Sequence, residues 1–552
     1  MKIPQFWAAK EQYLPEFTLI SLSSIYLGVF LNAPTFLQKY YYVEGGGFSL
    51  FLADVVFGFA ASAFLLCVLS IFGRRVLKMG IVFFIFVSAI ASYYIWFFDV
   101  VIGYAIIQAV FGTEISLMIE SMDLALLAFF MVFAMVPVFL LGRFSTEYTA
   151  PWWLFLIPRS ISIGLLILGL VQLNVYYKNF REPMADARLR TNPIGVATFS
   201  YIPTNWASAA LISVANARMN SQLQEQLVDP MDHYGFYPGA PLDELFVVVV
   251  IGESARHDHM SLLGYEIETT PLLDKEPNVF GFKGTSCNTS TKLSLACMFV
   301  REGGVEDRGS PSEQFTYENH VFSVFKKLGF SSDVLAMQSE AGFYVRWDAD
   351  SVKIREQIGA EASLNGNAII DDMLLVEQME QSISQKSGQH LVILHQKGSH
   401  FNYASRYPET FSKFLPDCKN MHCDPESMIN SYDNSIAYTD YFLFSLLEKL
   451  RGKKALLLYA SDHGESLENG KHFHASPKDA APAEQFNIPV IMWASDLLLQ
   501  DKLFAEGFDA LRRHESAGET VRQVEIFESL LGCMGIKSDG NGIRNRNNWC
   551  ST

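Results

Sequence analysis

The chain has 552 residues, of which half are hydrophobic and 18% are charged, and its formal net charge at pH 7 is −16. This length exceeds what one hydrophobic core supports, so we expect two or more structural units. The acidic balance and the lack of a dense Lys/Arg run argue against a nucleic-acid partner. Composition is uneven, because residues 1–176 are apolar with few charges, whereas residues 177–552 resemble a soluble domain.

Five apolar segments in the first part are long enough to cross about 30 Å of hydrocarbon. They cover residues 17–37, 48–72, 79–98, 122–142 and 156–176. Basic residues precede the first segment and separate the second from the third, whereas the connection at 99–121 contains no Lys or Arg. This distribution predicts a transmembrane domain over residues 1–176, a cytoplasmic N-terminus and an exported region after the fifth span.

The 99–121 connection is expected on the exported side of the membrane. Its polar residues Thr113 and Glu114 can contact a lipid headgroup there. An interfacial re-entrant helix is the alternative for this apolar stretch.

Residues 177–240 are expected to bridge the membrane domain and the soluble domain. Thr204 or Asn205 can cap a helix over residues 206–219. The apolar side of that helix would carry Trp206, Ala210, Leu211 and Val214. Such a face suits a helix on the membrane surface, or a helix packed on the soluble domain.

From residue 245 onward, short apolar runs alternate with helical segments. The runs cover residues 245–251, 334–337, 391–394, 455–459 and 489–493. Their continuous apolarity predicts strands buried on both faces, and therefore a mainly parallel sheet with helices on both sides, in an α/β domain over residues 241–552. Active sites of such domains lie at the carboxyl ends of the strands.

Six of the seven cysteines lie in the predicted exported region, and Cys67 lies in a predicted span, where a buried hydrophobic role is favoured. Six cysteines allow many pairings. Nearest-neighbour pairs would close three short loops, joining Cys287 to Cys297, Cys418 to Cys423 and Cys533 to Cys550. Each bond would stabilise the fold by about 2–3 kcal/mol in an oxidising compartment.

Residues 284–298, GTSCNTSTKLSLACM, place Thr291 between Cys287 and Cys297. A disulfide across this segment would hold one hydroxyl in place. Nucleophilic catalysis needs such a frame, because an alcohol is a weak nucleophile until a base or a metal lowers its pKa. We interpret Thr291 as a nucleophile that attacks phosphorus; a stapled surface loop is the alternative.

Carboxylates and histidines follow the predicted strands. They are Glu253, His395, His400, Asp462, His463, Glu465 and His474. Carboxylate oxygens and neutral imidazoles suit a tetrahedral zinc site with one open position, which Thr291 can fill. Each residue has a structural alternative, as a helix-start acid or a turn residue. The set as a whole favours a metal site, in which the metal would generate the Thr291 alkoxide and neutralise phosphoryl charge.

Five longer segments carry a known pattern: GESARHDHMSLLGYEIETTP, SCNTSTKLSLACMF, HQKGSHFNYASRYP, INSYDNSIAYTD and SDHGESLENGKHFH. They closely resemble the lipopolysaccharide phosphoethanolamine transferases, inner-membrane zinc enzymes of the alkaline phosphatase-like (sulfatase) superfamily. The resemblance covers essentially the full length. TKLSLACMFVR, KGSHFNY and NNWC most resemble the members that act on the Kdo sugar, and SEAGFYVRWDAD lacks the cysteine pair of the enzymes that modify lipid A phosphate.

The resemblance implies roles for particular residues. The principal zinc ligands are Glu253, Thr291, Asp462 and His463, with Thr291 as the nucleophile. His400 and His474 match histidines near the phosphoryl group or a second zinc, and we group His395 and Glu465 with them. In the donor-binding loop only Thr113 matches, with Ala109 and Leu117 at the other places, so donor binding there is rebuilt around Glu114 or absent.

The resemblance also implies the reaction. Phosphatidylethanolamine would donate phosphoethanolamine to Thr291, and a Kdo hydroxyl of lipopolysaccharide would accept it. The enzyme would be a monomer in the bacterial inner membrane with its catalytic domain in the periplasm, and the added positive charge would weaken binding of cationic antimicrobial peptides.

Alternative functions are a lipid A phosphate transferase, a phosphoglycerol transferase or phosphodiesterase, and an inactive membrane sensing module. A sulfatase is disfavoured, because residues 287–297 lack the Pro and Arg of a formylglycine context. We further expect Cys287 and Cys297 to position the nucleophile, so their loss should reduce activity more than loss of Cys533 or Cys550.

Overall fold

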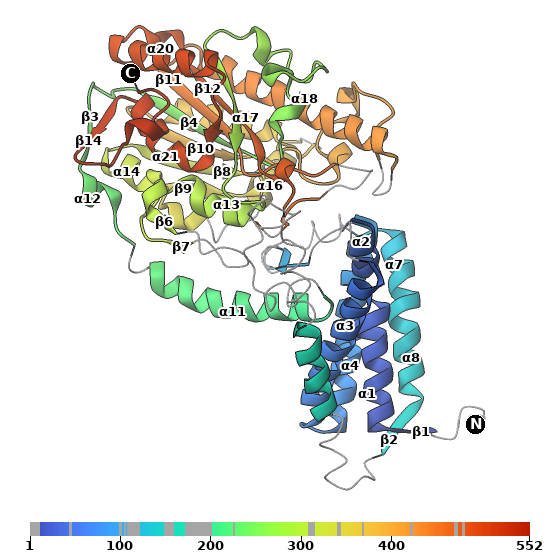
Figure 1. Ribbon diagram of the computed structural model, residues 1–552. Helices are drawn as coiled ribbons and strands as arrows, with labels where there is room; N and C mark the ends of the chain where they lie inside the picture. The colour runs from blue at the N-terminus through green and yellow to red at the C-terminus, as the bar shows by residue number, and fades with distance from the viewer. Residues whose placement is uncertain are drawn as a thin grey trace. The chain divides into compact units, whose positions relative to one another are not determined.

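The structure is a computed structural model of the whole chain. It describes residues 12–42, 47–98, 102–103, 106–107, 122–147, 159–171, 201–224, 227–306, 315–338, 344–366, 369–419, 423–467, 473–476, 478 and 481–551. Contacts divide the described residues into two compact units, and the division falls between Ala215 and Asn216, inside helix α11 (Thr204–Gln224). The first unit is helical, and the second contains a large sheet (Figure 1).

The first unit consists mainly of apolar helices. Its elements are α1 (Glu16–Ile25), η1 (Tyr26–Phe30), α2 (Ala33–Tyr42), α3 (Gly47–Ser70), α4 (Arg74–Phe98), α7 (Leu124–Phe130), η2 (Met131–Met135) and α8 (Val136–Gly142), with a short strand pair, β1 (Gln12–Pro15) and β2 (Phe144–Glu147). Within the described part of the chain, three helices are long and apolar enough to cross a membrane, namely Phe51–Ser70, Arg74–Phe98 and Leu124–Gly142. The first and fifth predicted spans contain the shorter apolar helices Glu16–Phe30 and Arg159–Val171. Five spans therefore remain a prediction, of which three have the required length.

Close backbone contact and a buried amide hold this unit together. A Cβ atom at Gly28 would lie 2.0 Å from the carbonyl oxygen of Gly58, so η1 and α3 approach at a distance that only glycine permits. The Asn32 side chain pairs with the backbone of Ile202, which donates to Asn32 Oδ1 at 2.7 Å and accepts from Nδ2 at 2.6 Å. The segment before α11 is thus fixed to the helices.

Helix α11 begins at Thr204, two residues before the predicted start, and its predicted apolar face is wrong. Trp206 is buried beside Phe83 and Phe84 of α4, whereas Leu211 is 73% exposed. The two positions do not share a face, because five residues of helix turn through about 140°. Trp206 therefore packs on α4 within the helical unit.

The second unit is built on an eight-stranded sheet in the order β13-β5-β12-β11-β4-β10-β8-β9. The strands are β4 (Phe246–Gly252), β5 (Val279–Thr285), β8 (Ser331–Ala336), β9 (Ser351–Lys353), β10 (His390–His395), β11 (Ala455–Ser461), β12 (Asn487–Ala494) and β13 (Val521–Arg522). All five predicted strands are present. Strand β12 is antiparallel to both neighbours and every other pair is parallel, so the sheet is mixed but mostly parallel.

Both faces of the sheet are covered, as the continuous apolar runs require. Alternate residues of β4 enter two separate hydrophobic cores. One core lies under α13 (Thr291–Met298), α14 (Val321–Lys327), α20 (Lys502–Ser516) and α21 (Ile526–Cys533), and the other lies under α16 (Arg355–Leu364), α17 (Met373–Gln385) and α18 (Pro425–Leu450). Figure 1 shows these helices around the sheet.

Short elements complete the unit. They are α12 (Pro230–Tyr234), α19 (Asp496–Leu499), the antiparallel pair β3 (Phe236–Pro238) and β14 (Ile536–Ser538), and the antiparallel pair β6 (Val305–Glu306) and β7 (Phe315–Thr316).

Strand register brings distant residues to one edge of the sheet. Ile251 of β4 is level with Ala460 of β11 and His395 of β10, and His395 is level with Ala336 of β8. Two residues beyond these positions, the segments that follow the four strands carry Asp462, Glu253, Lys397 and Gln338. Strand β5 has the same direction as β4 and β12 the opposite one, so the segment after β5 and the loop before β12 also reach this edge.

Candidate active site

The segment after β5 forms the expected turn around Thr291. Thr291 is the first residue of α13, and a disulfide joins Cys287, before the helix, to Cys297, inside it. The other two nearest-neighbour pairs, Cys418 with Cys423 and Cys533 with Cys550, are also bonded, which confirms the predicted pairing. Cys67 is free and buried.

A glutamine from a remote part of the chain ties this turn to the end of β11. The backbone N–H of Cys287 donates to Gln523 Oε1 at 2.9 Å. Gln523 Nε2 in turn donates to the carbonyl oxygens of Ser461 and Asp462, at 3.0 and 2.9 Å. Because Gln523 is fully buried, one amide fixes the spacing between the Thr291 turn and Asp462.

A second set of bonds ties the turn to the loop that precedes β12. The N–H of Ala475 donates to the carbonyl oxygen of Thr289 at 2.7 Å. The hydroxyl of Thr289 donates to the carbonyl oxygen of Ser476 at 2.6 Å. His474, next to Ala475, is therefore held near Thr291 by backbone contacts.

Three of the expected metal ligands meet at the Thr291 hydroxyl. Thr291 Oγ1 lies 3.2 Å from Glu253 Oε2 and 3.4 Å from His463 Nε2. Ligand atoms of Glu253, Asp462 and His463 all lie within 4.8 Å of one another, and the three residues are buried. The structure thus brings together all four residues expected for the principal site.

Hydrogen bonds orient these groups toward a common centre. His463 Nδ1 donates to the carbonyl oxygen of Gly464 at 2.9 Å, which leaves Nε2 as the acceptor facing Glu253 and Thr291. Asp462 Oδ1 accepts the N–H groups of Ser254 and His463, at 3.1 and 2.7 Å. Its other oxygen, Oδ2, is buried 3.3 Å from His463 Nε2 and has no hydrogen bond among the described residues.

Burial makes the charges of this group costly. Burial and the neighbouring Asp462 carboxylate raise the pKa of Glu253 to about 7. Burial is the main cause of two further shifts: it raises the pKa of Asp462 to about 6 and lowers the pKa of His463 to about 4. Two crowded carboxylates beside a neutral imidazole and a hydroxyl match the ligand preferences of Zn²⁺, because a divalent cation would neutralise both carboxylates.

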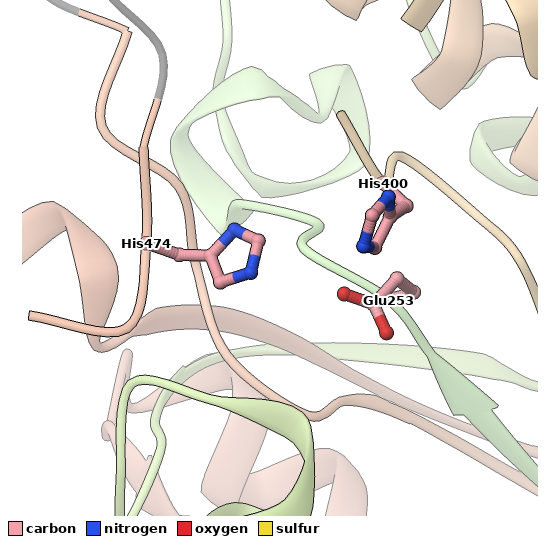
Figure 2. A group of neighbouring side chains, drawn as sticks. All are labelled: Glu253, His400 and His474. Atoms are coloured by element: carbon pink, nitrogen blue, oxygen red, sulfur yellow. The ribbon is translucent and has the colours of Figure 1, made fainter. Parts of the chain in front are cut away.

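A second group shares Glu253 with the first. Ligand atoms of Glu253, His400 and His474 lie within 4.8 Å of one another, and Figure 2 shows the three side chains around one common space. His474 Nδ1 lies 3.1 Å from Glu465 Oε2, and Glu465 Oε1 is buried without a hydrogen bond among the described residues. Burial opposes a charge on His474, but the Glu465 carboxylate raises its pKa to about 9.

His400 and His474 have pKa values that shift in opposite directions. Burial, reinforced by the positive charge of Lys397, lowers the pKa of His400 well below its usual value. The two imidazoles lie on either side of one space, and their rings are 5.8 Å apart.

One described residue of the expected set, His395, is not part of either group. His395 is the buried last residue of β10, and its Nδ1 is hydrogen-bonded to the hydroxyl of Tyr344. Burial lowers the pKa of His395 to about 3. The interpretation of His395 as a substrate or metal residue has no support from this geometry. Thr113 and Glu114 lie outside the described residues.

Other residues of the site were missed in the sequence. Gln338 Nε2 donates to Glu253 Oε2 at 2.9 Å, and Lys397 Nζ donates to Gln338 Oε1 at 3.2 Å. Asp372 and Gln523 hold the backbones of Lys397 and Cys287. Gln338 could have been found, because it follows a predicted strand as Glu253 does, whereas no local pattern distinguishes Gln523.

Family models match both units. The model for phosphoethanolamine transferases EptA/EptB covers residues 60–204, and the model for sulfatases covers residues 246–536.

Full-length relatives match as well. The chain is 38% identical to the Kdo(2)-lipid A phosphoethanolamine 7''-transferases of Escherichia coli (strain K12) and Salmonella typhimurium, over 98% of this chain and of each relative. Among solved structures, the integral membrane lipooligosaccharide phosphoethanolamine transferase A (EptA) of Neisseria meningitidis has a TM-score of 0.80 at 23% identity and covers 98% of both chains. The Neisseria protein shares the fold of this chain.

Proposed function

Since the chain belongs to the phosphoethanolamine transferase family, we propose that it transfers phosphoethanolamine from phosphatidylethanolamine to a Kdo sugar of lipopolysaccharide. The acceptor follows from the two relatives that are named for it and that match over nearly the whole length. The observation that carries the chemistry is the position of the Thr291 hydroxyl, which lies at the N-terminus of α13 beside Glu253 and His463.

We propose that Glu253, Thr291, Asp462 and His463 hold a zinc ion. Zinc in that place would lower the pKa of the Thr291 hydroxyl and offset charge on the phosphoryl group. Around it, Glu253 and Asp462 supply two negative charges, and the neutral His463 offers Nε2 as a lone-pair donor. The disulfide and Gln523 hold the turn that carries Thr291 beside these residues.

Transfer then takes two displacements at phosphorus. In the first, Thr291 Oγ forms a bond to the phosphorus of phosphatidylethanolamine, the bond from phosphorus to the diacylglycerol oxygen breaks, and the proton lost by Thr291 is balanced by one gained by diacylglycerol. In the second, a Kdo hydroxyl oxygen bonds to phosphorus, the Thr291 ester breaks, and the sugar's proton is balanced by one returned to Thr291.

His400, His474 and Glu465 are proposed to contact the phosphoryl oxygens or a second metal ion. The protonated His474 offers positive charge to an anionic group, while the neutral His400 offers a hydrogen bond or a lone pair. Thr113 and Glu114 are proposed to contact the donor headgroup.

The arrangement in the membrane is part of the proposal. The five apolar segments would cross the bacterial inner membrane, and residues 241–552 would form the catalytic domain in the periplasm, with residues 177–240 as the connection. A monomer placed this way meets donor and acceptor headgroups in one plane, which replaces a search in three dimensions by a local encounter.

The test of the covalent step is the intact mass of the full-length protein in detergent after incubation with phosphatidylethanolamine, followed by peptide mapping. We expect a phosphoethanolamine adduct on Thr291 that is absent from T291A. The matched control is S290A, because the neighbouring Ser290 hydroxyl is buried and makes no hydrogen bond among the described residues. An adduct that persists in T291A, or disappears in S290A, contradicts the assignment.

The acceptor needs a separate measurement. Lipopolysaccharide from cells that express the protein should carry the added group on Kdo, as located by fragmentation mass spectrometry. A group found on lipid A phosphate would instead support the alternative transferase.

A further inference from the structure

Glu253 is held by a chain of side chains from the neighbouring strands. Gln338, Lys397 and Glu253 stand two residues beyond level positions of β8, β10 and β4, which are adjacent in the sheet. All three are buried, with exposed fractions of 3%, 6% and 1%. Their contacts are therefore protein contacts and not solvent contacts.

Every polar group of the Gln338 amide has a partner. Nε2 donates to Glu253 Oε2 at 2.9 Å and to the carbonyl oxygen of Gln396 at 3.1 Å, while Oε1 accepts from Lys397 Nζ at 3.2 Å. The reversed amide would turn its oxygen toward two acceptors and its N–H groups toward an ammonium, which has no acceptor. The orientation of Gln338 is thus fixed, with its donor facing Glu253.

The contacts of Glu253 show what this orientation achieves. Oε2 accepts from Gln338 and faces Thr291 Oγ1 at 3.2 Å. Oε1 accepts from Ser254 Oγ at 2.9 Å and lies 3.5 Å from His463 Nε2. Each carboxylate oxygen has two lone pairs. Gln338 and Ser254 therefore occupy one lone pair on each oxygen. The second lone pair of Oε2 accepts from the Thr291 hydroxyl, and that of Oε1 faces His463.

The other end of the chain is also fixed. The Asp372 carboxylate accepts the N–H of Lys397 at 2.7 Å and the N–H of Gly398 at 2.8 Å. Asp372 is itself buried just before α17. Asp372 therefore anchors the backbone of Lys397 without any contact to the Glu253 side chain. Lys397 and Gln338 in turn hold that side chain in place.

From these contacts we infer that Gln338 and Lys397 are positioning residues for Glu253 and set the affinity of the site for a divalent cation. This inference deepens the proposed function and depends on its zinc site. Gln338 acts directly on the carboxylate. Lys397 acts through Gln338, because it is the donor that the buried amide oxygen would otherwise lack.

Zinc affinity of the full-length protein in detergent, measured by competition with a chromogenic chelator, tests the inference. We expect Q338M to raise the Kd for zinc about 10- to 100-fold, the usual effect of losing a partner that holds a ligand. K397M should raise the Kd by a smaller factor, and K397R, which keeps a donor, should stay near the wild-type value.

Two further variants separate positioning from general damage. The double variant Q338M/K397M should bind no more weakly than Q338M alone, because Lys397 acts through Gln338. The matched control K353M removes a lysine of the adjacent strand β9 that bonds Glu361 at 3.0 Å, and it should leave the Kd unchanged. Thermal unfolding of the chelator-treated proteins verifies that each variant is folded.

The outcomes are distinct. An unchanged Kd in folded Q338M, or a double variant whose loss is the product of the single losses, overturns the inference. A wild-type protein that takes up no zinc overturns the zinc part of the proposed function before any variant is compared.

Discussion

The disulfide around Thr291 leads to a prediction in which stability and activity should separate. C287S/C297S removes a bond between residues with a sequence separation of 10, and C533S/C550S removes a bond between residues with a sequence separation of 17. The loss of loop-closure entropy corresponds to about 2.8 kcal/mol for the first and about 3.2 kcal/mol for the second. On stability alone, the loss of Cys533–Cys550 should therefore be slightly more harmful.

Activity should show the opposite order. The Cys287–Cys297 bond joins the turn to the helix that begins at Thr291, so its loss frees the nucleophile relative to Glu253 and His463. A displacement of about 1 Å at a reacting atom can reduce a rate about 100-fold. We expect C287S/C297S to lose about 10- to 100-fold in rate, and C533S/C550S to stay near the wild-type rate while it is folded.

The assay measures transfer from phosphatidylethanolamine vesicles to lipopolysaccharide by mass spectrometry, at a temperature well below the unfolding transition of both variants. The unfolding temperatures are recorded separately, so that each rate refers to folded protein. Equal rate losses in the two variants, or a larger loss in C533S/C550S, would show that the bond around Thr291 stabilises the fold without positioning the nucleophile.

Three further outcomes are expected. G28A should destabilise the helical unit by about 1–3 kcal/mol or more, because its Cβ would lie 2.0 Å from the Gly58 carbonyl oxygen; G142A, which meets no atom within 4 Å, is the control in thermal unfolding. Burial lowers the pKa of His320 from 6.5 to about 4. The neutral His320 therefore contributes fully to the free energy of unfolding above pH 6.5, and about 3 kcal/mol of that free energy is lost as the pH falls to 4. An H320Q variant whose unfolding temperature falls as steeply as that of the wild type across this range would refute the reasoning. Chelation should abolish transfer and added Zn²⁺ should restore it, whereas full activity after complete metal removal, verified by elemental analysis, would contradict the zinc site.

The sheet and part of the site could be predicted because their signals are local. Uninterrupted apolar runs identified five strands, and the rule that sites form at strand ends selected Glu253, Asp462 and His463. Strand β5 was not predicted, since its residues VFGFKGT do not form a continuous apolar run: buried positions alternate with partly buried or exposed ones, and two residues are glycines. The face of α11 was misjudged because composition does not show which side of a helix meets a neighbour.

Residues that act through others could not be predicted in the same way. The role of Gln338 depends on the position of β8 two strands from β4 in the sheet. The order of strands in a sheet cannot be read from the sequence of any single segment. Gln523 is 236 residues from Cys287 in sequence. A glutamine of this kind has no recognisable motif, and its importance arises only from the place to which the fold brings it.

The contact between Gln523 and the Thr291 turn also affects when the enzyme becomes competent. Chains are synthesised from the N-terminus, and domains fold as their segments emerge. The nucleophile turn receives its partner Gln523 only after 236 further residues have been synthesised beyond Cys287. In the exported arrangement proposed above, a nascent chain that has not yet reached Gln523 has an unfinished site. Transfer would then begin only after the exported region had crossed the membrane as far as Gln523.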